Sequence, residues 1–284
     1  MNKKLLVIAL AAAGLSANAM ALTFNDGELN GGVDVGGTIT VPVATNQWQW
    51  ATGDALSAFS HNVVQMTNNY KTLTITMAAD SPLLVGQTKA ATVGAVGGVG
   101  ITPRISLMQA DGTTPVVINY GSTANGKGSM SLQVVDSATP TTVLGSAVVN
   151  VKTAALVSFH NAGDPYVVIG SLEQVVDSPF GAAAPMDRSS AMPVAQADSW
   201  VLALGGKGGD VQVADANTLM GTSLPRVNAA DGYSRMSFGN PGATYGGAYG
   251  LGIASGDNIV VNFTNPITAT TNWKAPLNVA VTYL

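Results

Sequence analysis

The sequence predicts an all-β protein in which many short antiparallel strands pack as a sandwich. Apolar and polar residues alternate along several segments, and turn pairs such as Asp111-Gly112 and Asn125-Gly126 separate these segments. Charged residues make up only 10% of the 284 residues. Alternation at a period of two gives a strand one apolar face, and strands repeated at about ten-residue spacing are typical of a β-sandwich.

Residues 1–21 have the pattern of a cleaved secretory signal. Basic Lys3 and Lys4 precede an apolar run, and the sequence Ala19-Met20-Ala21 follows it with small residues at both ends. This order is typical of a secretory signal, whereas a membrane anchor would need about twenty apolar residues. We expect cleavage after Ala21 and export of the mature chain.

Residues 22–44 are expected to form an N-terminal arm. From Leu29 onward, apolar residues or glycine hold the odd positions, while most even positions are polar. The apolar face of this arm carries Leu29, Val33, Val35 and Ile39. Glycine lowers the intrinsic stability of such a strand, so we expect the arm to order only against a groove that another protein supplies.

Residues 45–284 are expected to form the sandwich itself. The strand candidates show alternation or a short apolar run bounded by turn residues, and they are 47–50, 72–77, 83–89, 103–108, 116–120, 129–135, 143–151, 249–253, 258–263 and 277–283.

The last of these strands is expected to leave one edge open. Its apolar residues alternate with small or polar ones, and they are Leu277, Val279, Val281 and Tyr283. An exposed strand edge invites pairing with another protein. The alternative is an ordinary sandwich in which the first and last strands pair within one chain.

An inserted, partly helical subdomain is expected at about residues 154–222, where the strand rhythm stops. Gln196–Leu204 and Val213–Met220 are the helix candidates, the second with Asp210 or Asp215 as its N-cap. Surplus loops on a rigid sandwich are where binding tends to occur.

Two aromatic residues of this insertion are candidates for binding a sugar. Tyr166 lies close to Asp164, and Trp200 lies close to Lys207. Aromatic rings stack on the apolar faces of sugars, and charged side chains hold the hydroxyl groups. The alternative is that these side chains staple the insertion to the sandwich.

No other motif indicates catalysis, a metal site or a cofactor. The sequence has no cysteine, two histidines, two glutamates and no G-x-S-x-G nucleophile elbow. The glycine-rich runs 94–100 and 205–209 do not have the spacing of a phosphate-binding loop and are expected to be loops. A net charge of −4 argues against nucleic acid as a partner.

Several segments together resemble a known family. They are Leu29–Thr40, Lys71–Met77, Pro82–Lys89, Arg226–Asn228, Tyr249–Gly256 and Trp273–Tyr283. In order and sequence they resemble the major-subunit adhesins of kappa-class chaperone–usher fimbriae, the FaeG and ClpG type. The absence of cysteine also fits this family.

The resemblance implies an incomplete immunoglobulin-like (pilin) β-sandwich that lacks its last strand. A periplasmic chaperone would pair with the strand at 277–283, and the arm of an identical subunit would replace it at the outer-membrane usher. This is donor-strand exchange. The resemblance also implies an extracellular fimbrium on the bacterial surface that binds host-cell glycans through the insertion.

The predicted function is therefore that of a structural fimbrial subunit, not an enzyme. Two alternatives remain at this point: an outer-membrane β-barrel protein and an exported hydrolase. Against the barrel, aromatic residues are only 6% of the sequence, and its last residue is Leu284 rather than an aromatic one.

Overall fold

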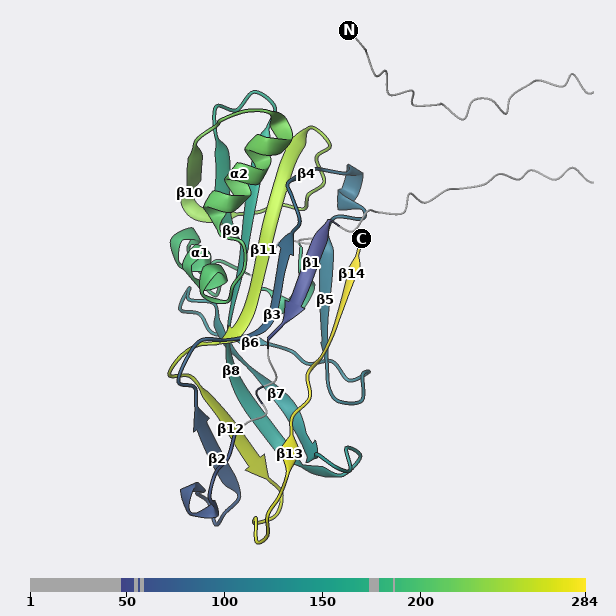
Figure 1. The fold of residues 1–284 in the computed structure, drawn as a ribbon, viewed down its shortest axis with the longest axis vertical. Coiled ribbons are helices and arrows are strands. Elements are labelled where there is room, and N and C mark those ends of the chain that lie inside the picture. Colours follow the sequence, from purple (N-terminus) through teal and green to yellow (C-terminus); the bar gives the residue numbers. More distant parts are fainter. Residues whose placement is uncertain (1–46, 54–55, 57–58, 174–178, 186) are drawn as a thin grey trace, which may run out of the picture. The chain divides into compact units, whose positions relative to one another are not determined.

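The structure is a computed structural model, and it describes residues 47–53, 56, 59–173, 179–185 and 187–284. The predicted signal with its cleavage site at Ala21, and the arm residues Leu29, Val33, Val35 and Ile39, lie outside the described residues. Within the described part, strands dominate and two α-helices are present, which confirms the predicted all-β fold (Figure 1).

The main sheet has the order β1-β3-β11-β8-β12-β2. These strands are β1 (Trp48–Thr52), β2 (Thr72–Thr76), β3 (Ser81–Thr88), β8 (Val143–Asn161), β11 (Ala243–Ile253) and β12 (Asn258–Phe263). All neighbours along this path are antiparallel.

Strand β8 is 19 residues long and connects two halves of the fold. Its first half pairs with β12 and with β7 (Lys127–Asp136), while its second half pairs with β11 and with β9 (Val167–Leu172). The expected start of the insertion, residue 154, therefore lies inside a strand that continues to Asn161.

The remaining strands are short or lie beside the main path. β4 (Thr92–Val93) pairs with β11, β6 (Asn119–Tyr120) and β13 (Trp273–Lys274) pair with β7, and β10 (Arg226–Ser234) runs parallel to β9. β5 (Pro103–Met108) and β14 (Asn278–Tyr283) form a separate two-stranded sheet.

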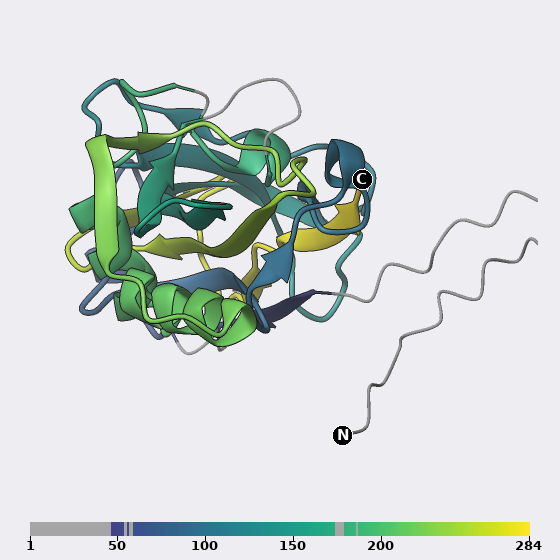
Figure 2. The same ribbon diagram turned by 90° about the horizontal axis from the view of Figure 1, so that it is seen from above.

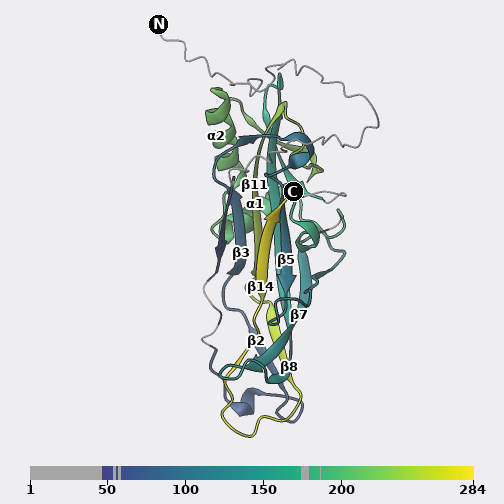
Figure 3. The ribbon, with the colours of Figure 1, turned by 90° about the vertical axis from the view of Figure 1, so that its right-hand side faces the viewer.

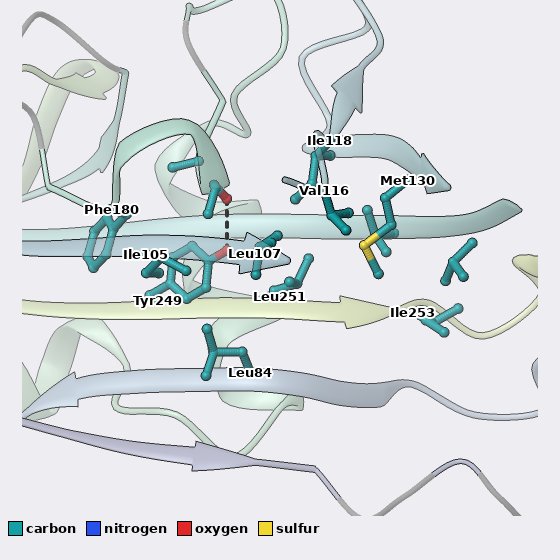
Figure 4. Close-up of a cluster of buried hydrophobic side chains, with 14 of the residues drawn as sticks. Leu84, Ile105, Leu107, Val116, Ile118, Met130, Phe180, Tyr249, Leu251 and Ile253 are labelled. Carbon is teal, nitrogen blue, oxygen red and sulfur yellow. Dashed lines mark hydrogen bonds between the residues drawn. The ribbon is translucent and has the colours of Figure 1, made fainter. Parts of the chain in front are cut away.

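The larger core lies between β5 on one side and β3 with β11 on the other. Ile105 and Leu107 face Leu251 and Leu84 across it (Figure 4). The hydroxyl of Tyr249 donates to the carbonyl oxygen of Ala183 at 2.8 Å. Complete burial raises the pKa of the Tyr249 phenol well above its ordinary value, so the phenol stays a hydrogen-bond donor in this core.

A second core lies between the sheet and the helices α1 (Val194–Ala203) and α2 (Gly209–Met220). The helices form a layer on one side of the sheet (Figure 2). Gly250 and Gly252 of β11 lie against the Leu204 side chain, and a Cβ at either position would crowd it. The glycines in Tyr249-Gly-Leu-Gly-Ile253 thus let α1 approach the sheet closely.

The two helices occur where the sequence predicts them, but the expected N-cap of α2 is wrong. Gly208 is the N-cap, and it contributes no side-chain hydrogen bond. Instead, Asp198 of α1 accepts the Gly209 N–H at 2.9 Å and also pairs with Arg226 at 2.8 Å. One free N–H at the start of α2, that of Gly209, thus has its acceptor on another helix, and local sequence patterns do not reveal this contact.

Replacing Asp198 with Ala is expected to destabilise the folded subunit by about 1–2 kcal/mol, because the Gly209 N–H loses its acceptor and Arg226 loses an ion-pair partner. Urea unfolding of the purified subunit measures this change. Ser199→Ala is the matched control, since the Ser199 hydroxyl bonds only within its own helix, to the Ala195 carbonyl oxygen. Equal stability of the two variants would contradict the role of Asp198.

Candidate strand-pairing site

Strand β14 is paired on one edge only within the described part of the chain. Its partner is β5, in antiparallel register from Asn278 opposite Met108 to Tyr283 opposite Pro103. The two strands lie side by side in Figures 1 and 3. No other described strand pairs with β14, so its second edge is open there.

The hydrogen bonds at the end of β14 identify the backbone groups on this open edge. The Leu284 N–H donates to the Thr102 carbonyl oxygen at 3.1 Å, so the backbone of Leu284 faces β5. Backbone direction alternates along an antiparallel strand. The N–H and C=O groups of Val279, Val281 and Tyr283 therefore face the open edge and form a template for another strand.

The apolar side chains in and just before β14 cover the core incompletely. Leu277, Val279, Val281 and Tyr283 pack against the larger core, but each is only half-buried. By contrast, all eleven residues of β11 are buried. The apolar face of the last strand therefore keeps surface that an added strand could remove from water.

Strand β1, on its side of the core, also has one unpaired edge within the described residues. Among the described strands it pairs with β3 alone. Its Trp50 stacks on Trp48 at 5.7 Å between ring centroids, and the Trp50 Nε1 donates to the Tyr283 hydroxyl at 3.0 Å. A side-chain hydrogen bond thus links β1 to β14, and no backbone ladder is described between them.

Trp50 was not among the predicted site residues, although the sequence contained a signal for it. Alternation in Gln47-Trp-Gln-Trp50 places both indoles on one face of a strand. Periodicity does not show that one of these rings reaches the last strand, because that contact joins residues 233 positions apart.

The four predicted glycan-binding residues do not form one accessible surface. Trp200 is 3% exposed, and its Nε1 donates to the Lys152 carbonyl oxygen at 3.1 Å. The Lys207 Nζ donates to the Thr88 carbonyl oxygen at 2.8 Å and pairs with Asp215. Both side chains staple the helices to the sheet, which is the alternative interpretation of the sequence.

Asp164 and Tyr166 lie together in the segment between β8 and β9, and both are partly accessible. The Asp164 carboxylate accepts from the Asn161 amide at 3.3 Å. A glycan site at these two residues stays a prediction. Within the described residues, no three His, Cys, Asp or Glu side chains are arranged to hold a metal ion.

Comparison with known proteins identifies the family. A family model described as "Fimbrial, major and minor subunit" matches residues 2–284. The chain belongs to this family of fimbrial subunits. It is similar to the K88 fimbrial proteins AC and AB of Escherichia coli, each at 32% identity over 98% of both chains. It is also 25% identical to the F41 fimbrial protein of Escherichia coli over the full length of both chains.

Family membership gives the chain a structural role as a subunit that polymerises into surface fimbriae. None of the described helices is both long enough and apolar enough to cross a membrane.

Val281→Asp is expected to destabilise the fimbrial subunit by about 1–3 kcal/mol, because it removes apolar contact with the core and brings a charge to a half-buried position. The amount of folded subunit in periplasmic extracts measures this loss. Thr282→Asp places the same charge on the exposed face of β14 and is expected to leave the amount unchanged. Equal amounts of the two variants would contradict the packing of Val281.

Proposed function

We propose that this chain is the major structural subunit of an adhesive fimbria and polymerises by donor-strand exchange. The arm at residues 22–44 of one copy adds to the open edge of β14 in the preceding copy. The observation that carries this proposal is the state of β14: one paired edge, one open edge, and four apolar side chains only half-buried against the core.

The added strand is proposed to run antiparallel to β14. Antiparallel pairing is slightly more stable per residue than parallel pairing. Main-chain hydrogen bonds to Val279, Val281 and Tyr283 supply affinity, and alternate side chains of the arm fix its register. The donor side chains are Leu29, Val33, Val35 and Ile39. Burying each one contributes about 1.5–3 kcal/mol.

The same edge requires a partner before polymerisation. An exposed edge with an apolar face promotes aggregation, so a subunit needs a temporary strand during export. We propose that a periplasmic chaperone supplies it and that exchange for the donor arm takes place at the outer-membrane usher. Both partners follow from the family resemblance, and the open edge of β14 supports a strand-adding chaperone.

The proposed adhesive role includes binding of host-cell glycans. It follows from the family resemblance, and the accessible candidates in this chain are Asp164 and Tyr166. Trp200 lies in the second core, between the sheet and the helices, and stabilises their packing.

The donor role of the arm is tested with Val35→Asp. The charge would have to be buried in the neighbouring subunit, so polymerisation is expected to fail while the subunit is still exported and chaperone-bound. Electron microscopy and denaturing gels without boiling measure the polymer. Thr38→Asp is the matched control, because position 38 lies on the opposite face of the predicted strand. Normal fibres from Val35→Asp would reject the arm as the donor.

Supplying the donor strand within one chain tests the open edge itself. A copy of residues 22–44 is fused after Leu284 through a short turn, and the natural arm is removed. A tight turn returns the strand antiparallel to β14. The fusion is expected to fold as a soluble monomer without chaperone, and to unfold at a higher temperature than the unfused subunit.

The same fusion carrying Val35→Asp in the added copy is the control and is expected to lose this gain. If the unfused mature chain is equally stable and monomeric, the edge of β14 needs no partner and the proposal fails.

A further inference from the structure

An exposed apolar turn lies beside the end of β14. It comprises residues 95–100 and is called here the Val96 turn. Val96 is 78% exposed and Val99 is 55% exposed. The turn is held in place by the Gly100 N–H, which donates to the Leu284 carbonyl oxygen at 2.5 Å, and by the Ala95 N–H, which donates to the Phe238 carbonyl oxygen at 3.2 Å.

The glycines of this run explain why the valines point outward. Gly97, Gly98 and Gly100 have φ angles of 67°, 70° and 77°, a region that other residues rarely adopt. Gly98 also lies so close to Thr102 and to the Ser237 carbonyl that a Cβ would not fit. The glycine-rich run therefore builds a tight turn pressed onto the fold, and its valines are left in solvent.

A cavity adjoins the Val96 turn. Its volume is about 430 Å³, and its lining includes Gly97 of the turn and the side chains of Phe159, Met236 and Tyr245. The polar side chains of the lining are Asn161, Arg235, Ser237 and Asn240. The exposed valines of the Val96 turn thus adjoin a cavity with apolar and polar walls and room for a side chain. Single exposed valines need no explanation, but exposed apolar groups gathered at one place indicate an interaction site.

A second exposed apolar turn precedes β2. It comprises residues 62–71 and is called here the Val64 turn. Val64 is 78% exposed and Tyr70 is 51% exposed. Asn62 and Gln65 form a capping box around the short helix Val63–Gln65, which fixes the position of Val64.

The backbone of this turn is strained in a way that presents Tyr70. Asn68, Asn69 and Tyr70 have consecutive positive φ angles of 52°, 53° and 61°. Asparagine tolerates this conformation, whereas it is rare for a residue as bulky as tyrosine. The Tyr70 carbonyl accepts the Ile267 N–H at 3.0 Å, which helps to hold the turn. Strain of this kind tends to persist at functional positions.

The two turns lie at opposite ends of the described sandwich. In Figures 1 and 3, the loop that precedes β2 is at the lower end, while β4, which leads into the Val96 turn, lies toward the upper end near the C-terminus. β1 begins at the upper end as well, since the Trp48 Nε1 donates to the Ile101 carbonyl oxygen at 2.8 Å. The start of β1 therefore lies at the same end of the sandwich as the Val96 turn.

We infer that the Val64 turn of one copy packs against the Val96 turn and cavity of the next copy along the fimbria. This inference rests on the proposed donor-strand exchange. A donor strand antiparallel to β14 has its C-terminal end beside Asn278, the end of β14 that is remote from the Val96 turn. The donor's own body follows on that side, so its Val96 turn faces the Val64 turn of the acceptor.

This contact is head-to-tail. It joins two different surfaces of identical copies, and such contacts produce open filaments when the rotation between copies does not close. Tyr70 is the side chain suited to the cavity, because its ring can pack on Phe159, Met236 and Tyr245 while its hydroxyl meets the polar side chains of the same lining. The donor strand then links successive copies, and the end contact sets the angle between them.

Cysteine crosslinking tests the contact, because the chain has no cysteine of its own. Fibres are assembled from a chain carrying Val64→Cys and Val96→Cys and are treated with a short bismaleimide. Boiling in detergent then separates copies that are not crosslinked. We expect a ladder of subunit multiples. The matched control carries Val64→Cys and Leu202→Cys, because Leu202 of α1 is 56% exposed, and it is expected to give single subunits.

A ladder in neither chain, or equal ladders in both, would overturn the end contact. If the double variant forms no fibres, copies with Val64→Cys and copies with Val96→Cys are each mixed with the natural chain and with one another. The contact then predicts crosslinked dimers only where both variants are present, and their absence overturns it. Failure of the donor strand is distinguished by Val35→Asp: fibres from that chain reject the donor arm, whatever the crosslinking shows.

Discussion

The unpaired edge of β14 is the constraint on which the rest of this fold depends. A strand whose backbone groups face solvent on one side, and whose apolar side chains are half-covered, gains stability from a second strand there. β5 satisfies one side of β14, and the Trp50 indole reaches Tyr283 from the other. Among the described strands, β14 and β1 thus flank one gap that a side-chain hydrogen bond crosses and no backbone ladder closes.

The helix layer covers the face of β11 that points away from the larger core. Residues on both faces of β11 are buried, so this outer face would be exposed to water without the helices. α1 and α2 cover that face, with Trp200 and Val201 in the second core and Gly250 and Gly252 admitting Leu204. The helix layer thus buries the apolar surface of β11 that faces away from the larger core.

Sequence patterns predicted the strands that have one apolar face. β5 was predicted with its observed bounds, and the alternation in β14 identified the side chains that face the core. β9 and β10 were missed, because neither strand alternates between apolar and polar residues. β9 is short and largely buried on both faces, and β10 is an irregular parallel strand that contains Ala229-Ala-Asp-Gly232. Contacts distant in sequence were also hidden, as with Asp198 at the start of α2 and Trp200 beneath Lys152.

Strand β8 has a mechanical consequence for a fibre under tension. Its 19 residues pair with β7 and β12 in one half and with β9 and β11 in the other, so a single continuous backbone connects both halves of the sandwich. A pull directed along this strand loads its ladders in shear, so that many hydrogen bonds must break together rather than one after another. Because the chain has no cysteine, no disulfide joins the two halves, and resistance to such a pull would come from this strand and its hydrogen-bonded neighbours.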